Sequence, residues 1–577
     1  MKQLSIRRGT LALIRAQPGV FMLALAGGVF YFATRLAPGW IEKLYFDRLT
    51  QGAAAPGSSL SLGALVGLLL AVELVRSLVD YGGKMSETGL RNRGGSLLRA
   101  NVVRNILRRP GALAQPVTPG DAVGRLGDDV EDFADFPTWL PYLLGEGLFA
   151  LAALAILFQI APRITLLALL PLAGVLLLNR LAFRRLLHYS RQSRQAAGQV
   201  AGFLGEILGA VQAVKVADAG DGVIGHFRRL NEERRRLSVR ETLFRALFHA
   251  LSGNMGDLAV ALMVVLVGGA LARRELSVGD FALFASYLFF AAQFPALVGS
   301  FMSEIAQERA VLDRLQELQP EAAPQSLVEA GAGQDPATQP VAAKAGPGGG
   351  IRAGAGSSPL LVARGLTYRY PGGGGIEGVD FTLRAGSLTV ITGPVGAGKT
   401  TLLRALLGLL PRDAGEIWWR GEAVADPAAF FVPPRSAYTP QVPRLFSETL
   451  RENIMLGAPA GEAQLRAAVS AAVLTPDVAR LEQGLETVVG PRGVRLSGGQ
   501  VQRAAAARML VRGAQLLVMD DLSSALDVET EQQLWRNLTA MKRDAQPATM
   551  LVVSHSHAVL LRADQVIVLQ DGRVAPQ

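Results

Sequence analysis

The sequence predicts a membrane-embedded α-helical domain followed by an α/β domain. Three features lead to this expectation. The first half of the chain holds six apolar stretches, each of roughly the 20 residues that cross a bilayer core. A segment rich in Pro, Ala and Gly follows. After it, short β-rich runs alternate with helical stretches, which is the pattern of a largely parallel sheet.

Composition agrees with a domain that has the bilayer as its solvent. Hydrophobic residues make up 50% of the 577 residues and charged residues only 18%, whereas soluble domains carry about a quarter charged residues. The net charge of +10 is compatible with a nucleic acid or anionic lipid as binding partner, or with an excess of Lys and Arg in cytoplasmic loops. The chain has no cysteine, which excludes disulfides, thiolate metal sites and a cysteine nucleophile.

The candidate membrane spans all lie within residues 1–319. Because their number is even, both ends of this domain lie on one side of the membrane, and the basic N-terminus with Lys2, Arg7 and Arg8 places that side in the cytoplasm. Two long Arg-rich loops have helical spacing, so we expect them to extend the spanning helices beyond the bilayer; a basic surface for anionic head groups is compatible with the same residues. The spans are predicted at 20–39, 60–80, 140–160, 163–182, 254–272 and 281–301.

A change of composition marks the domain boundary. Residues 320–358 are rich in Pro, Ala and Gly and lack a hydrophobic period, as a flexible linker does. Residues 359–577 then contain the apolar runs LTVIT, LLVMD, MLVVS and VIVL, which predict the strands of the α/β domain.

A glycine-rich loop follows the first of these runs and precedes a helical stretch, which is the context of a P-loop. Its backbone N–H groups would wrap phosphates, Lys399 would neutralise the β and γ oxygens, and Thr400 would offer its hydroxyl to Mg²⁺. A chance glycine-rich turn is the alternative. We therefore predict an α/β P-loop ATPase domain whose loop contains Gly393, Pro394, Val395, Gly396, Ala397, Gly398, Lys399, Thr400 and Thr401.

A carboxylate is expected beside this loop. The apolar residues 516–519 run directly into Asp520, so the side chain lies at the carboxyl end of a strand, where it can hold Mg²⁺ next to the phosphates. An aspartate that only caps a helix is the alternative.

The segment LSGGQ, residues 496–500, followed by VQRAAAARMLV, resembles the ATP-binding cassette (ABC) family. The resemblance runs from about Leu360 to the end of the chain. It implies that Ser497, Gly498, Gly499 and Gln500 close over the γ-phosphate bound by an opposite cassette, so that a competent ATP site needs two cassettes. It also implies that Tyr370 stacks on adenine, Gln441 senses Mg²⁺ and the membrane domain, Asp527 contacts the other cassette and His555 contacts the γ-phosphate.

One position departs from the family pattern. The residue after Asp520 is usually a glutamate that orients or deprotonates the attacking water, and this chain has Asp521. The carboxylate is one methylene shorter, and a general base must lie within hydrogen-bond reach of its proton. The substitution resembles one subunit of an asymmetric heterodimer, a catalytically weak regulatory half whose partner supplies the glutamate. A homodimer that hydrolyses ATP with the aspartate is the other possibility.

Six spans before one cassette resemble the half-transporter arrangement of multidrug and lipid exporters. This resemblance implies a dimer with a second half-transporter, identical or different, and ATP-driven export of a hydrophobic or amphipathic substrate, whether drug, lipid or peptide, by alternating access. Residues 118–133 and 205–233 look like the cytoplasmic loops that dock on the cassettes in this family. We expect a multi-pass protein of the bacterial plasma (inner) membrane with a cytoplasmic cassette. A soluble cassette ATPase acting on nucleic acid would lack the spans, so no nucleic-acid partner is expected.

Two carboxylates lie in or near predicted spans. Glu73 and Glu146 are candidates for binding cationic groups, because ionisable residues inside a membrane are commonly functional. The alternative is that both lie at helix ends and meet water.

Overall fold

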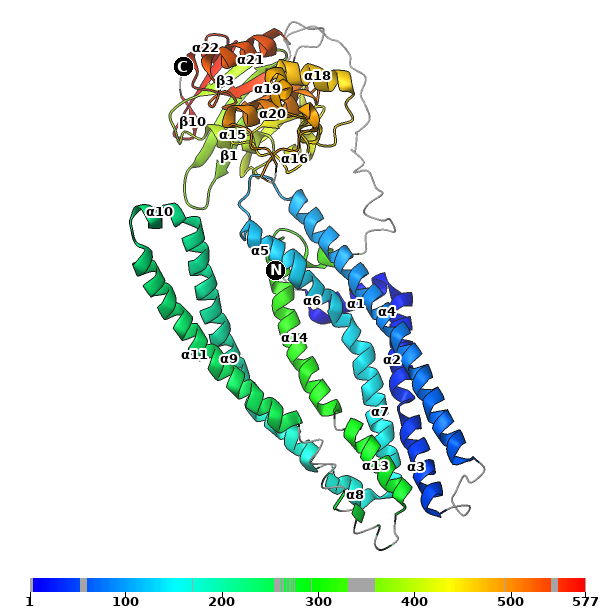
Figure 1. The fold of residues 1–577 in the computed structure, drawn as a ribbon. Helices are drawn as coiled ribbons and strands as arrows, with labels where there is room; N and C mark the ends of the chain where they lie inside the picture. Colours follow the sequence, from blue (N-terminus) through cyan, green and yellow to red (C-terminus); the bar gives the residue numbers. More distant parts are fainter. Residues whose placement is uncertain are drawn as a thin grey trace. The chain divides into compact units, whose positions relative to one another are not determined.

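The computed structural model describes residues 4–51, 60–168, 170–253, 261, 264–265, 267–268, 271, 273, 276–291, 293–329, 359–491, 493–540 and 548–575. The chain divides into two compact units (Figure 1). The first comprises Met1–Ile106 and Pro116–Pro340, and the second comprises Leu107–Gln115 and Val341–Gln577.

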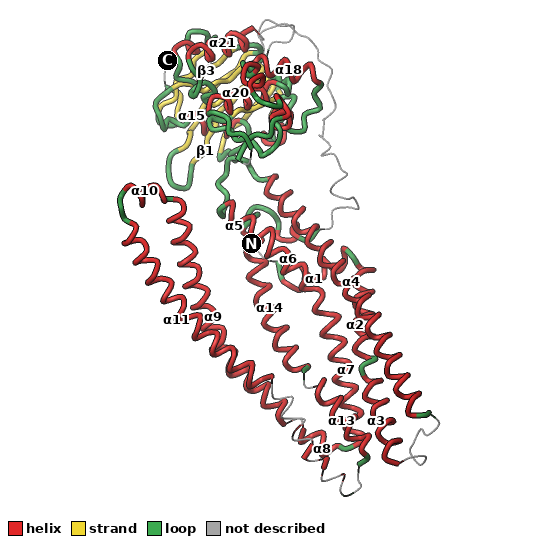
Figure 2. Tube along the Cα trace, viewed as in Figure 1, coloured by secondary structure: helices red, strands yellow, loops and turns green. Residues whose placement is uncertain are grey.

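The first unit is built of helices, in agreement with the predicted membrane domain (Figure 2). A π-helical turn lies at Arg125–Asp129 and short 3₁₀ helices lie at Phe136–Thr138 and Pro324–Leu327. The α-helices are α1 (Ile6–Ala16), α2 (Pro18–Ala33), α3 (Leu36–Gln51), α4 (Leu62–Arg108), α5 (Pro119–Gly124), α6 (Val130–Asp135), α7 (Trp139–Ile160), α8 (Pro162–Ala168), α9 (Leu170–Gly209), α10 (Val211–Val216), α11 (Gly220–Gly253), α13 (Val278–Ala291) and α14 (Phe294–Glu317).

Within the described residues, three helical segments are long and apolar enough to cross a membrane: Pro18–Thr50, Leu62–Arg108 and Pro119–Ile160. They contain the predicted spans 20–39 and 140–160 and all but the first two residues of the predicted span 60–80. On α4, Leu70, Leu74 and Leu78 are each more than 60% exposed, as expected of side chains that face lipid. Helix α4 has 47 residues and is therefore about 70 Å long at 1.5 Å per residue, so it extends well beyond a bilayer core, as predicted.

The other predicted spans map less simply. The stretch 281–301 is divided between α13 and α14, because Pro295 occupies the first turn of α14, where its missing N–H and fixed φ favour a helix start over continuation of α13. The stretch 163–182 falls on α8 and α9, and most of its side chains lie outside the described residues, as does most of 254–272. The count of six spans stays a prediction.

Close helix packing holds the bundle of α2, α7 and α13 together. Buried Phe32, Phe149 and Tyr287 form its core. Gly145 of α7 lies so near α2 that a Cβ at this position would be 2.5 Å from Phe32 Cδ2. The absence of a side chain at residue 145 therefore sets the distance between the two helices.

The second unit contains two sheets. The six-stranded sheet, in the order β10-β9-β3-β8-β7-β6, is parallel from β9 to β6, as the sequence predicted. An antiparallel sheet, in the order β2-β1-β4-β5, was not anticipated. The strands are β1 (Pro359–Arg369), β2 (Gly375–Arg384), β3 (Leu388–Thr392), β4 (Ala414–Trp419), β5 (Glu422–Ala423), β6 (Ser436–Thr439), β7 (Leu516–Asp520), β8 (Thr549–Val553), β9 (Gln565–Gln570) and β10 (Arg573–Val574).

Helices accompany both sheets, and two buried apolar clusters form the core of the unit. The helices are α15 (Lys399–Leu406), α16 (Pro427–Phe430), α17 (Leu450–Met455), α18 (Glu462–Ala471), α19 (Thr475–Arg480), α20 (Gly498–Leu510), α21 (Val528–Ala540) and α22 (His557–Leu560), with a 3₁₀ turn at Gly484–Glu486.

A segment from the first half of the chain is part of this second unit. Leu107–Gln115 belongs to it, with the Ala112 N–H donating to the Leu409 carbonyl at 2.9 Å and Leu113 packing on the apolar core. Residues 118–133, which the sequence analysis expects to dock on the cassettes, lie in the first unit. Docking of residues 118–133 and 205–233 on the cassettes stays a prediction.

We expect Gly145→Ala to destabilise the helical unit by about 1–3 kcal/mol, because the added methyl group overpacks the contact with Phe32. Gly67→Ala on α4 is the matched control, since nothing lies within 4 Å of its added Cβ and alanine favours a helix over glycine. Thermal unfolding of the full chain in detergent measures both variants. Equal midpoints for the two would contradict the packing described.

Candidate nucleotide site

The order of the parallel strands brings most predicted site residues to one edge of the sheet. Carboxyl ends of neighbouring parallel strands meet at the same edge. Here β3 is followed by the P-loop and β8 by His555, β7 ends at Asp520, and Gln441 lies two residues beyond β6. The register pairs Asp520 with Val553 and Ile391 with Val553, so the strand ends are level.

The P-loop has the backbone that the sequence predicted. Gly393, Gly396 and Gly398 all have positive φ. A Cβ on Gly393 would lie 2.0 Å from the Leu569 carbonyl oxygen, so no other residue fits there. Lys399 Nζ donates to the carbonyl oxygens of Gly393 and Pro394, at 2.8 Å each, which places the ammonium group inside the curve of the loop. Ala397 is buried and Val395 is almost fully exposed.

Thr400 and Asp520 lie together as expected of metal-binding partners. The Thr400 hydroxyl donates to Asp520 Oδ1 at 3.1 Å, and the Tyr438 hydroxyl donates to Oδ2 at 3.4 Å. Asp520 is fully buried. Burial raises the pKa of the Asp520 carboxyl, and the Thr400 hydrogen bond and the nearby Arg404 oppose the rise.

These oxygen atoms suit Mg²⁺. Among the described residues, no group of three or more His, Cys, Asp and Glu could hold a metal ion. Mg²⁺ commonly takes only one or two protein ligands and completes its shell with phosphate oxygens and water. A hydroxyl and a carboxylate beside a phosphate-binding loop are therefore a sufficient donor set, and Thr400 and Asp520 would hold the ion.

Asp521 has an unusual backbone conformation. Its φ is +54°, in the left-handed region that Asp and Asn adopt more readily than most residues. Its N–H donates to the Val553 carbonyl at 3.0 Å, and its Oδ2 accepts from Gln441 Nε2 at 3.4 Å. The backbone thus turns the Asp521 carboxylate toward Gln441.

Tyr370 lies beside the P-loop helix. Its hydroxyl is 3.3 Å from Thr401 Oγ1, and its ring contacts that of Tyr368 edge-on at 4.9 Å. The side chain is 37% exposed, which leaves area for a planar ligand. Adenine stacking stays a prediction.

The LSGGQ segment begins helix α20. Ser497 is its N-cap and forms a reciprocal capping box with Gln500, the residue pattern that stabilises helix starts. Gly498 and Gly499 are its first two residues and pack on Ala525. Gln500 Nε2 donates to Asp477 at 2.9 Å. These contacts hold the segment in place from within its own cassette.

Asp527 precedes α21 and caps it. Its Oδ1 accepts from the Thr530 N–H at 2.9 Å, and that bond holds the pKa of Asp527 below its ordinary value. His555 is exposed directly after β8. Both residues are exposed, and their predicted roles remain untested.

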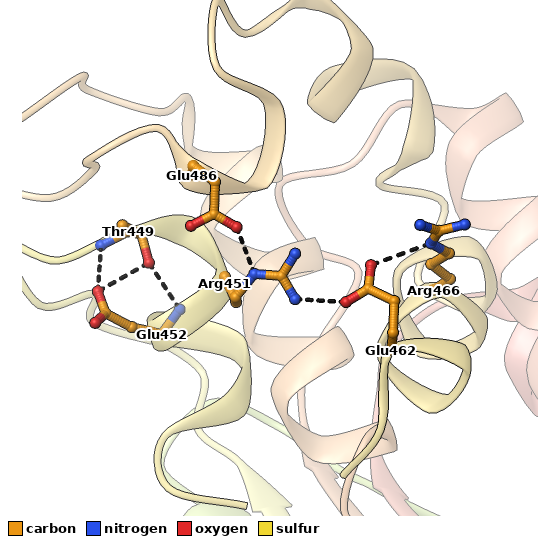
Figure 3. A network of polar contacts seen from close by, with 6 residues as sticks. All are labelled: Thr449, Arg451, Glu452, Glu462, Arg466 and Glu486. Atoms are coloured by element: carbon orange, nitrogen blue, oxygen red, sulfur yellow. Dashed lines mark hydrogen bonds and ion pairs between the residues drawn. The ribbon is translucent and has the colours of Figure 1, made fainter.

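A polar network connects the helices that follow Gln441 (Figure 3). Thr449 and Glu452 form the capping box of α17. Arg451 bonds both Glu486 and Glu462, and Glu462 also accepts from Arg466. The charged members are largely exposed, so each pair contributes little stability, and the network mainly fixes how α17, α18 and the turn at Gly484–Glu486 are placed.

Sequence reasoning missed three residues of this site. Tyr438 bonds Asp520 from β6, Arg404 lies one helical turn after Thr400, and Asp477 holds both Gln500 and Arg503. Helical spacing from Thr400 could have found Arg404. No local pattern indicates Asp477, because its contacts are made only by the tertiary fold.

The carboxylates in the predicted spans both have partners. Glu146 is 3% exposed and pairs with Arg35 at 3.1 Å, while the Arg35 guanidinium lies 4.0 Å from the Phe290 ring centre. Glu73 pairs with Arg76 at 2.6 Å. The alternative that Glu146 lies at a helix end and meets water is therefore wrong, and its charge is compensated within the bundle.

Comparison with known proteins decides the family. A family model described as ABC transporter matches residues 376–524, and one described as ABC transporter transmembrane region matches residues 20–293. The chain belongs to the ABC transporter family. Its fusion of a membrane region and a cassette confirms the predicted half-transporter arrangement and fold class.

Relatives of this ABC transporter include flippases and a multidrug transporter. It is 26% identical to the ATP-dependent lipid A-core flippase of Burkholderia orbicola, over 98% of this chain and 91% of the flippase. It is 27% identical to the ABC multidrug transporter mdr2 of Aspergillus fumigatus, over 98% and 70% of the two chains. A bacterial Atm1-family ABC exporter with ATP bound has the same fold, with a TM-score of 0.75, 22% identity, and 98% and 95% of the two chains covered. The names of these relatives do not favour the alternative that the chain is a catalytically weak, regulatory half of a heterodimeric exporter.

We expect Asp477→Ala to lower the free energy of unfolding of the cassette by about 3 kcal/mol, because it leaves the nearly buried Arg503 without its carboxylate. Glu462→Ala, which breaks exposed pairs in the same region, is the control and should leave the unfolding midpoint almost unchanged. Denaturant unfolding of the full chain in detergent measures both. A similar loss of unfolding free energy in the two variants would show that the pairing of Asp477 with Arg503 does not stabilise the cassette.

Proposed function

We propose that this chain is one half of a dimeric exporter that uses ATP to move a hydrophobic or amphipathic substrate across a bacterial inner membrane. The observation that carries the proposal is the fusion, in one chain, of apolar membrane-crossing helices with a sheet edge where Lys399, Thr400, Asp520 and Asp521 lie together. ATP closes two cassettes on each other, and hydrolysis releases them, so that the nucleotide shifts the population between inward-facing and outward-facing states.

The P-loop binds the phosphates of ATP in this mechanism. Lys399 exchanges its bonds to the Gly393 and Pro394 carbonyls for bonds to phosphate oxygens, and the backbone N–H groups of the loop surround the β-phosphate. Thr400, Asp520 and Gln441 would hold Mg²⁺, which would supply positive charge beside the phosphates. Tyr370 covers the base.

Asp521 serves as the general base. The oxygen of the attacking water forms a bond to the γ-phosphorus while the bond to the bridging oxygen breaks, giving ADP and phosphate, and the proton passes to the Asp521 carboxylate. Gln441 donates to Asp521 Oδ2 and keeps it directed at the strand edge. His555 steadies the γ-phosphate from the end of β8.

The other half of the dimer is a second copy of this chain. The signature segment Ser497–Gln500 is intact and already ordered by Asp477, so it can close over the γ-phosphate of the opposite cassette, with Asp527 at the same interface. A carboxylate is retained at residue 521. Each copy therefore carries both the ATP-binding half-site and the segment that completes the other half-site.

The test is steady-state ATPase activity of the purified chain in lipid nanodiscs, with the assembly mass determined. We expect a homodimer whose activity exceeds that of Lys399→Ala, and a fall of about 100-fold in Asp521→Asn, because the amide cannot accept the proton. Asp521→Glu should raise the rate, since the longer side chain reaches the water better. Equal rates for wild type, Asp521→Asn and Lys399→Ala would refute hydrolysis by this site.

A further inference from the structure

A polar pocket of about 580 Å³ lies within the helical unit, between α4, the α6–α7 segment and the first turns of α14. Helix α4 contributes Lys84, Glu87 and Arg91. The segment around the start of α7 contributes Asp135, Trp139 and Tyr142. Nothing in the nucleotide mechanism uses these residues.

The pocket lies where the apolar parts of its helices end. The predicted spans stop at residue 80 on α4 and at residue 301 on α14, and the span on α7 starts at residue 140. Lys84 follows the limit on α4 by four positions, Trp139 and Tyr142 lie on either side of the limit on α7, and Ser300 lies next to the limit on α14. These limits correspond to the level of lipid head groups. Trp and Tyr are the aromatic residues enriched at that level.

A polar face of α4 leads from the pocket into the span. Glu73, Ser77 and Asp80 precede Lys84 at helical spacing, and Glu73 and Ser77 are exposed. A charged side chain facing lipid at the middle of a membrane costs about 3 kcal/mol. The ion pair with Arg76 offsets part of that cost for Glu73, and Ser77 and Asp80 continue this polar face to the pocket at its cytoplasmic end.

The charges of the pocket are balanced. Lys84 Nζ lies 2.9 Å from Glu87 Oε2, and Arg91 lies 3.7 Å from Asp135. Lys84, Arg91 and Asp135 are each 45–58% exposed in their side chains, so a ligand can reach them. A purely anionic head group would meet two carboxylates here, and a purely cationic one would meet an ammonium and a guanidinium group.

We propose that this pocket recognises a zwitterionic head group, a phosphate joined to an amine, on the amphipathic substrate. The phosphate lies between Lys84 and Arg91, which are charged donors for its oxygens. The ammonium group faces Glu87 and Asp135 and the ring faces of Trp139 and Tyr142, which attract cations. The inference rests on the proposed export of amphipathic molecules and specifies their head group.

The test compares two lipids that differ only in the head group, dihexanoyl phosphatidylethanolamine and dihexanoyl phosphatidylglycerol, on the full chain in detergent. Binding is followed by tryptophan fluorescence, and Trp139→Phe shows how much of the signal comes from the pocket. We expect the zwitterionic lipid to bind about tenfold more tightly, from two partly exposed charge contacts. Glu87→Gln should remove most of that preference, because it leaves the pocket with a net positive charge. Lys84→Gln should weaken the binding of both lipids.

Arg93→Gln is the matched control, since Arg93 is an exposed cation on the same helix outside the pocket, and it should keep the tenfold preference. The proposal would be overturned if the wild type bound both lipids equally or if Glu87→Gln kept the preference. It would also be overturned if Trp139→Phe showed the same fluorescence change as the wild type. ATPase activity of the same preparation without added lipid is measured separately. Its absence would count against the proposed function, whereas loss of head-group preference with intact ATPase activity counts only against the pocket.

Discussion

The parallel sheet of the cassette is the constraint on which the nucleotide site depends. Strands β3, β8, β7 and β6 are adjacent and level, so residues more than 150 positions apart in the chain converge at one edge. The loop after β3 supplies backbone donors and Lys399, and the end of β7 supplies Asp520. Any change that shifted one of these strands by a residue would move its side chain to the other face and separate Thr400 from Asp520.

Two adjacent carboxylates at this edge have different environments and suit different tasks. Asp520 is fully buried and accepts from Thr400 and Tyr438, so its position is fixed, as a ligand to a metal ion requires. Asp521 is only partly buried and has a left-handed backbone that directs its shorter side chain toward Gln441. The backbone conformation determines where this carboxylate points.

Much of the fold and of the site could be predicted from local sequence, and the rest could not for physical reasons. The P-loop, Asp520 and the signature segment are defined by residue types at fixed spacing, so they can be recognised from the sequence pattern alone. Asp477 and Tyr438 act through tertiary contacts that no local period reveals. The antiparallel sheet escaped prediction because its strands are interrupted by shifts of register. The burial of Glu146 could not be predicted, because its partner Arg35 is 111 residues away in the sequence.

The measurement that tests the account most directly is ATP-dependent movement of a fluorescent, amine-bearing phospholipid across the membrane of proteoliposomes that contain only this chain. The account predicts movement that requires Mg²⁺ and ATP, is abolished by Lys399→Ala, and is lost in Ser497→Arg, which blocks the segment that closes over the opposite site. Lipid movement at the same rate without ATP, or in Lys399→Ala, would contradict this account. The absence of lipid movement in a preparation that hydrolyses ATP would also contradict it.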